Sequence, residues 1–456
     1  MRPGPGFILA GTMVKTPEKH TLTKLMKKRL FLAWAGICAV IISGGFSLHT
    51  RLPAEDITPN AFKGTDTERI QQAIAKAAGT TNTVRIPSRN ANGTSVWMID
   101  KAILLPGNIR IILDNCTMQL SDQSRDNMFR SSNVGEGITD PGWNENIKMI
   151  GVGSVTLKGA ANPRATGDGA RTLTLDPKKE QDNGNWRVSY GSDAGKADQR
   201  QKGDWRNILI LIAKVKGFEL SNIRIENSHA WAISFERTWN ATLSGIRIHN
   251  PEDILIGDRK VRTYNKDGIN LRQGCKYFRI DNVTGINGDD LIALSSLNVA
   301  PALTGSNGSI SSTMVTSSIW SGPEDDTEQV FITNCQTNYT GVAIRAGDSA
   351  SIHHVYVNGI VTKARPDTPP PYGGSPYTLL VGGKGYGDPS QKGKINNIYA
   401  MNLMGDGKNL VLVEAPVTDC YFMNGIYTGG APAAVTYGVP PEALQNVSVT
   451  NLVKAN

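Results

Sequence analysis

Cysteine is scarce in this chain of 456 residues, and most of the sequence lacks long apolar runs. Four of the five cysteines follow the first fifty residues: Cys116, Cys275, Cys335 and Cys420. Their spacings match no zinc-binding pattern. Single cysteines in strands are usually small core residues. We therefore expect buried thiols here and no metal site.

Charge is also sparse, since charged residues make up 19% of the chain, whereas glycine occurs 48 times. This composition suits a protein of strands and turns better than a helical one. The formal net charge is +8, but residues 1–51 carry eight basic residues against Glu18 alone. The remainder is nearly neutral, so no basic face for nucleic acid is expected. A phosphate loop, a nucleophile elbow and a cofactor signature are all lacking, and no cofactor is expected.

The N-terminal residues are typical of an export signal. The basic stretch "KLMKKRL" precedes "FLAWAGICAVIISGGF", whose sixteen residues are short for a membrane span. A complete bacterial-type signal begins at Met26. We interpret residues 1–54 as a leader, either a cleaved signal peptide or an uncleaved anchor, with a possible upstream extension. Residues 55–456 are expected to form a single domain that is secreted or periplasmic.

Short alternating runs that close on asparagine recur along the chain, as in "LSNIRIEN", "LSGIRIHN" and "QVFITN". Most separations between these asparagines fit a unit of 22–24 residues, or two units, with insertions. Such a period without intervening helices indicates a solenoid of strands, in which asparagine at a turn tolerates left-handed φ. A leucine-rich repeat and a propeller both require patterns that are lacking here. The sequence predicts an all-β, right-handed parallel β-helix. The closing asparagines are Asn227, Asn250, Asn282, Asn334, Asn358, Asn402, Asn424 and Asn451.

One helix is predicted near the start of this domain. The run "TDTERIQQAIAKAAG", from Thr65 to Gly79, has apolar residues at helical spacing and a terminal glycine. A short helix here would cover the open end of the solenoid, whose first coil is otherwise an exposed sheet edge.

Three aspartates stand out against this repeat. Asp267 lies twenty-two residues, or one coil, before Asp289, which Asp290 follows. Adjacent coils lie about 4.8 Å apart, so these carboxyl groups should crowd together, and at least one pKa should rise. One acid can then stay protonated while another is ionised, which is the division of labour in glycoside hydrolysis. Gly288 suggests a turn or bulge that brings both neighbours to one face. Asp-Asp after Asn-Gly is also ordinary turn chemistry, and the coil-matched Asp267 favours a site.

These motifs resemble those of glycoside hydrolase family 28, the polygalacturonases and rhamnogalacturonan hydrolases, which are right-handed parallel β-helices. The family's Asn-x-Asp-Gly appears at Asn265 to Gly268, and its Gly-Asp-Asp at Gly288 to Asp290. The runs "KGTDTERIQQAIAKAAG" and "LPGNIRIILDN" are also similar to the family. The resemblance implies that Asp289 is the general acid, that Asp267 and Asp290 hold and activate water, that Asn265 binds substrate, and that the anomeric centre is inverted.

The chain departs from the family after the third aspartate. Thr340 and Gly341 stand where the family has Gly-His-Gly, and its Arg-x-Lys substrate clamp is not intact. Lys384 and Arg345 are candidate replacements for binding a uronate, although Arg345 also fits a solvated strand end. Trp231 fits either a sugar-stacking platform or core packing. Unbranched polygalacturonate is therefore expected to be a poor substrate, and a mixed pectic glycan such as a rhamnogalacturonan fragment a better one.

Two other functions stay open at this point. A polysaccharide lyase of the same fold class would use Asp267, Asp289 and Asp290 to hold Ca²⁺. A glycan-binding or tailspike-like β-helix would have no catalytic use for them. The favoured prediction is a secreted glycoside hydrolase, a monomer acting on a pectin-type or related uronic-acid-containing polysaccharide or oligosaccharide, with no metal and no nucleic-acid partner.

Overall fold

The computed structural model describes residues 56–455 except 123, 125, 136, 162–204, 229, 257–258, 263–265, 298–313, 318, 348, 364–375 and 384–388. Within it, Asp56–Asn456 form one compact unit. The predicted leader lies outside the described residues. Among the helices of the described part, none is long and apolar enough to cross a membrane.

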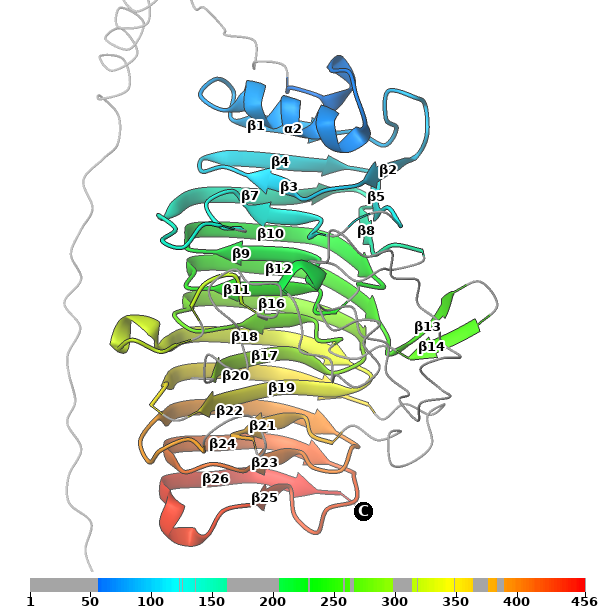
Figure 1. Cartoon of the computed structure of the whole chain (residues 1–456). Coiled ribbons are helices and arrows are strands. Elements are labelled where there is room, and N and C mark those ends of the chain that lie inside the picture. Colours follow the sequence, from blue (N-terminus) through cyan, green and yellow to red (C-terminus); the bar gives the residue numbers. More distant parts are fainter. Residues whose placement is uncertain are drawn as a thin grey trace, which may run out of the picture. The chain divides into compact units, whose positions relative to one another are not determined.

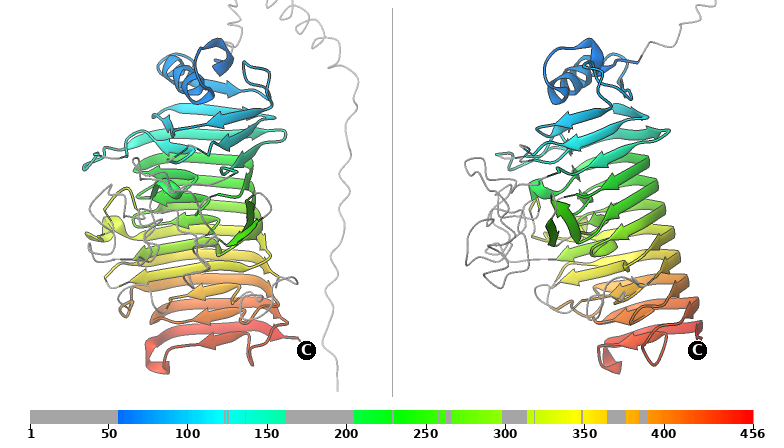
Figure 2. Two further views of the ribbon diagram at one scale, coloured as in Figure 1. Left: turned by 45° about the vertical axis from the view of Figure 1, so that its right-hand side comes forward. Right: turned by 90° about the vertical axis from the view of Figure 1, so that its right-hand side faces the viewer.

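This unit is a right-handed parallel β-helix, as the repeat predicts. Most coils contribute one long strand to a 14-stranded sheet and one short strand to a 10-stranded sheet, and Figure 2 shows the coils stacked along one axis. The long strands follow the order β1-β4-β7-β10-β12-β16-β18-β20-β22-β24-β26, with β2, β5 and β8 beside them (Figure 1). The short strands follow the order β3-β6-β9-β11-β15-β17-β19-β21-β23-β25.

The 14-stranded sheet comprises β1 Thr83–Ile86, β2 Val96–Ile99, β4 Ile109–Asp114, β5 Thr117–Leu120, β7 Asn144–Val152, β8 Thr156–Lys158, β10 Val215–Glu226, β12 Trp239–Asn250, β16 Lys276–Asn287, β18 Thr327–Thr337, β20 Ile352–Thr362, β22 Ile395–Gly405, β24 Val417–Tyr427 and β26 Leu444–Lys454. The 10-stranded sheet comprises β3 Ile103–Leu105, β6 Phe129–Ser131, β9 Ile210–Ala213, β11 Ile233–Glu236, β15 Ile269–Leu271, β17 Asp290–Leu297, β19 Thr340–Gly347, β21 Leu379–Val381, β23 Val411–Val413 and β25 Val435–Tyr437. The 3-10 turns are η1 Pro59–Ala61, η2 Trp205–Asn207, η3 Pro323–Asp325 and η4 Pro441–Ala443, and an inserted antiparallel hairpin pairs β13 Asp253–Ile256 with β14 Arg259–Arg262.

The core lies between the two sheets and consists mainly of stacked Ile, Val and Leu. In β15, for example, Ile269 and Leu271 are fully buried in it. Side chains alternate along a strand, so Asn270 and the following Arg272 face outward. The four cysteines are free and buried, as expected.

The asparagine repeat marks a bend that divides each long strand. Strand register aligns one bend position through successive coils, and every residue there has φ between 53° and 73°. Asparagine and glycine adopt this left-handed conformation most readily. The prediction that the closing asparagines occupy the same turn of every coil was wrong for three of them. Asn227 and Asn250 lie beyond the bend, and Asn358 precedes the bend residue Gly359. The aligned residues are Asn222, Gly245, Asn282, Asn334, Gly359, Asn402, Asn424 and Asn451.

The predicted helix is α2 Asp66–Ala77, which packs on the first strands (Figure 1). Thr65 and Glu68 form a reciprocal capping box at its start. Ile70, Ala73, Ile74 and Ala77 are buried, so their spacing sets the face that covers the end of the solenoid.

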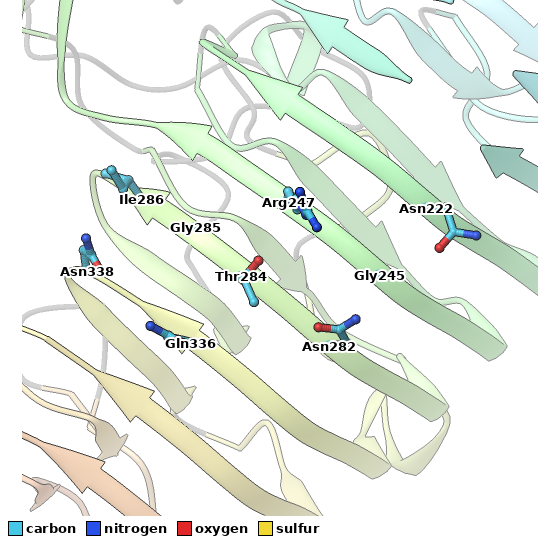
Figure 3. Close-up of a pocket in the computed structure, with 9 residues that line it drawn as sticks. All are labelled: Asn222, Gly245, Arg247, Asn282, Thr284, Gly285, Ile286, Gln336 and Asn338. Carbon is cyan, nitrogen blue, oxygen red and sulfur yellow. The ribbon is translucent and has the colours of Figure 1, made fainter. Parts of the chain in front are cut away.

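The outer face of the 14-stranded sheet carries a shallow polar hollow of about 530 Å³ around the bend (Figure 3). Arg247, Thr284 and Gln336 line it together with asparagines from neighbouring coils. None of the three predicted acids is among its lining residues, so this hollow is not the predicted site.

Candidate active site

The three aspartates lie together where two neighbouring strands of the 10-stranded sheet begin. Ile269 of β15 pairs with Ile292 of β17, which sets Asp267 beside Asp290. The amide of Gly268 donates to the Asp290 carbonyl at 2.8 Å. One carboxyl oxygen of each acid lies within 4.8 Å of those of the other two. The one-coil spacing thus brings the predicted residues into one carboxyl cluster, which here means Asp267, Asp289 and Asp290.

Two glycines allow this close approach. A Cβ on Gly268 would lie 2.5 Å from the carbonyl oxygen of Leu291, and one on Gly288 would lie 2.7 Å from side-chain carbons of Glu252 and Lys266. Neither position can hold a larger residue without moving the chain. The turn after Gly288 carries Asp289 and Asp290 into the cluster, as the sequence suggested.

Burial and mutual repulsion disfavour ionisation of two of the acids. Asp267 is 6% exposed, and desolvation with the Asp290 charge raises its pKa from 3.8 to about 7. Desolvation, followed by the charges of Asp267 and Asp290, raises the pKa of Asp289 well above its usual value. Like charges in a buried patch cannot all ionise at once. The cluster therefore retains protons at pH values where exposed aspartates have lost theirs.

Asp290 differs because both of its oxygens accept hydrogen bonds. Arg345 Nη1 donates to Asp290 Oδ2 at 2.5 Å, and Tyr377 Oη donates to Asp290 Oδ1 at 2.7 Å. Arg345 Nη2 also donates to Tyr377 Oη at 2.7 Å, which closes a triangle. Asp290 is thus the member of the cluster that is paired with a cation and a phenol. Burial, with the Asp290 charge, raises the pKa of Tyr377 well above its usual value, so the phenol keeps its proton.

Tyr377 is a site residue that the sequence reasoning missed. It lies one coil after Thr340, and its carbonyl accepts from the amide of Gly341. Thr340 and Tyr377 are 37 positions apart in the sequence, which does not fit the unit of 22–24 residues, so no spacing pointed to this tyrosine. Arg345 was predicted to bind substrate, but it is 8% exposed and its two terminal nitrogens contact Asp290 and Tyr377. The predicted contact of Arg345 with substrate stays a prediction.

Thr340 stands opposite Asp290 in the strand register, at the place predicted for the family histidine. Its hydroxyl donates to the Asp289 carbonyl at 2.9 Å, and Asn287 Nδ2 donates to the same oxygen. These contacts fix the turn that carries the acids. The position is therefore filled by a residue that orients the backbone and carries no titratable group.

The other predicted binding residues have different outcomes. Trp231 lies one coil before Asp267 and is half-buried beside a small apolar cluster on the outer face. The guanidinium carbon of Arg272 lies 5.1 Å from the centroid of its ring. Trp231 therefore stands opposite Asp267 in the strand register and beside Arg272. Asn265 and Lys384 lie outside the described residues.

Lys266 holds the turn before Trp231. It is fully buried, and its Nζ donates to the Ser228 carbonyl and, at 3.3 Å, to Asn250 Oδ1. Asn250 Nδ2 in turn donates to the Ala230 carbonyl at 3.1 Å. Desolvation lowers the pKa of Lys266 to about 7. Lys266, the variable residue of the Asn-x-Asp-Gly motif, is thus a buried side chain that holds the neighbouring turn in place.

Residues 167–360, which contain all three aspartates, match the model of "Glycosyl hydrolases family 28". This part of the chain is therefore similar to glycosyl hydrolase family 28. The resemblance that the motifs indicated is thereby confirmed. No curated protein sequence matches the chain.

Several solved structures have a similar fold. An endo-xylogalacturonan hydrolase from Aspergillus tubingensis is 13% identical, with 86% of this chain and 89% of that chain covered and a TM-score of 0.48. A double mutant of the tailspike protein of E. coli bacteriophage HK620 is 12% identical, with 88% and 67% covered and a TM-score of 0.51. An exopolygalacturonase from Thermotoga maritima is 14% identical, with 87% and 92% covered and a TM-score of 0.47. At these identities the likeness concerns the fold alone.

Proposed function

We propose that this protein hydrolyses a glycosidic bond in a pectin-type polysaccharide or oligosaccharide. The observation that carries the proposal is the carboxyl cluster, within a segment that matches a glycosyl hydrolase family. The cluster contains acids in two different environments, as glycoside hydrolysis requires. The pectic substrate is inferred from the family resemblance.

In the proposed mechanism Asp289 protonates the leaving oxygen, because its raised pKa keeps the proton available. Asp290 acts as the ionised partner, since Arg345 and Tyr377 stabilise its negative charge. Asp267 and Asp290 together hold and activate the attacking water. Each loss of one of these acids removes a proton donor or acceptor and is expected to lower the rate severely.

Inversion of the anomeric centre is part of the proposal and rests on the family resemblance. Inverting acids usually lie about 6.5–9.5 Å apart, with room for a water between them. One carboxyl oxygen of each acid lies within 4.8 Å of those of the other two, so the facing oxygens lie nearer than this separation between whole carboxyl groups. Both oxygens of Asp290 already accept hydrogen bonds, which suits a residue that orients water better than one that attacks carbon.

A calcium-dependent lyase is the second candidate, because three carboxylates within 4.8 Å of one another could also hold a divalent cation. The ion pair between Arg345 and Asp290 weighs against it, since a fixed cation already neutralises one of these carboxylates. Activity that disappears with chelator and yields unsaturated products would establish the lyase and refute hydrolysis.

The test of the proposal is a reducing-sugar screen across pectic polysaccharides, with Asp289→Asn as the inactive control. We expect release of reducing ends by the native protein and at least a hundredfold loss in the variant. Equal activity of both proteins would overturn the assignment of Asp289.

Export and a monomeric state are also proposed. Export is supported by the basic and apolar leader in the sequence. Fractionation of the source cells should recover the activity outside the cytoplasm, and light scattering should give the mass of a single chain. Activity confined to the cytoplasm would refute export, and a larger mass would refute the monomer.

A further inference from the structure

Arg272 is a buried cation beside the carboxyl cluster. It directly follows β15 and shares the outward face with Asn270. Its side chain is 5% exposed, and its guanidinium carbon lies 5.1 Å from the centroid of the Trp231 ring. Burial lowers the pKa of Arg272, whereas the negative charges of Glu236 and Asp267 raise it. It therefore lies within electrostatic range of the proposed reaction centre.

The guanidinium of Arg272 lacks a hydrogen-bonding partner in the described part of the chain. Its Nε is fully buried and unpartnered there, and it forms no ion pair with a described carboxylate. The hydroxyl of Ser234, whose strand position pairs with Asn270, is buried and unpartnered in the same way. Buried donors are normally satisfied, because leaving a charged donor without a bond costs free energy.

Nearby arginines show the usual arrangement. Arg237 forms two bonds to Asp325, and Arg345 bonds Asp290 and Tyr377. Glu236, the other acid that acts on Arg272, already accepts bonds from the amides of Val315 and Thr316. Within these described surroundings, Arg272 is thus a desolvated cation that the protein itself does not pair.

We propose that Arg272, supported by the ring of Trp231, binds the carboxylate of an acidic sugar unit adjacent to the bond that is cleaved. This deepens the proposed function and rests on it. A guanidinium offers a planar pair of donors to a carboxylate, and burial strengthens such bonds. The nearby negative cluster disfavours a doubly charged ligand such as a phosphate, because like charges repel.

This subsite lies at a different position from the family's Arg-x-Lys clamp, which is not intact in this sequence. Arg272 lies on the same coil as Asp267, whereas the expected clamp falls on later coils. A single cation suits a glycan in which an acidic sugar occupies one position and a neutral sugar the next. That specificity agrees with the expectation that unbranched polygalacturonate is a poor substrate.

The test measures binding independently of hydrolysis. In an Asp289→Asn background, calorimetry would compare an alternating galacturonate–rhamnose tetrasaccharide with its methyl ester. We expect the acid to bind at least tenfold more tightly than the ester. Adding Arg272→Gln should reduce this preference to less than twofold, and Arg272→Lys should retain part of it. Arg247→Gln, which removes an arginine from the 14-stranded sheet, is the charge-matched control and should leave the preference unchanged.

The outcomes separate this subsite from the catalytic proposal. An unchanged acid preference in Arg272→Gln, an equal loss for acid and ester, or no binding of the acid at millimolar concentration would each refute the subsite. Hydrolysis by the native protein could still stand in all three cases. Conversely, an arginine-dependent acid preference in a protein that hydrolyses nothing would support the subsite and refute the hydrolase.

Discussion

Replacing Asp267 by asparagine is expected to stabilise the folded protein at alkaline pH while it abolishes hydrolysis. Burial and the neighbouring Asp290 raise the pKa of Asp267 from 3.8 to about 7. In the unfolded chain this carboxyl ionises at its ordinary pKa, so folding at high pH must bury a charge that water would otherwise solvate. An amide of the same shape carries no charge and avoids this cost.

The sign follows from proton linkage. The folded protein binds this proton more tightly than the unfolded chain does, so the carboxyl favours folding most below pH 3.8. That contribution is lost as the pH rises from about 4 through about 7. One pKa unit corresponds to about 1.4 kcal/mol, so the loss reaches roughly 4 kcal/mol at pH 8. At pH 5 it is roughly 2 kcal/mol.

Urea denaturation of the native protein and of Asp267→Asn at the two pH values measures this effect. The gain in unfolding free energy of the variant should be roughly 2–3 kcal/mol larger at pH 8 than at pH 5. Asp140 is exposed, so Asp140→Asn is the matched control and should show no such difference. Equal gains for Asp267→Asn at both pH values would refute the claim that burial and repulsion disfavour the charge.

Four further results are expected. Asp289→Asn and Asp267→Asn should each lower kcat by about 10²–10⁴-fold with unchanged circular dichroism, and more than a tenth of native activity in either would contradict its role. Tyr377→Phe removes a hydrogen-bond donor to the Asp290 carboxylate, which is worth about 1.5–3 kcal/mol, and should lower kcat roughly 10–100-fold. Tyr277 is exposed, so Tyr277→Phe is the control. Equal rates for Tyr377→Phe and the native protein would show that the phenol does not support Asp290. NMR of the first product should show the anomer opposite to the substrate linkage, and a retained anomer would exclude the single-displacement mechanism. Chelator should leave the rate unchanged, because the proposed chemistry uses only carboxyl groups, and a dependence on Ca²⁺ would favour the lyase.

Much of the fold follows from local sequence patterns. Alternating β-branched residues, asparagine at the bends and the helical spacing of apolar residues from Ile70 to Ala77 each act over a few residues, and they predicted the coils and α2. The one-coil separation of Asp267 and Asp289 predicted their meeting, because a parallel solenoid converts a regular sequence interval into contact between neighbouring strands. A regular interval did not always mark the bend: Asn227 and Asn250 are 23 residues apart, yet both lie beyond it, so the predicted alignment was wrong there.

Other features depend on contacts that no interval encodes. Insertions of variable length separate Asp290 from Arg345 and Tyr377, so only the folded coils show that both side chains donate to that carboxylate. Arg272 lies near Asp267 in sequence, but its burial against Trp231 depends on the neighbouring coil. The sequence by itself determined the β-helix and the meeting of the acids, because both depend on a repeat. The tertiary structure decided which acid is paired with Arg345 and which cation is left unpaired, because desolvation and hydrogen-bond partners arise only where several coils come together.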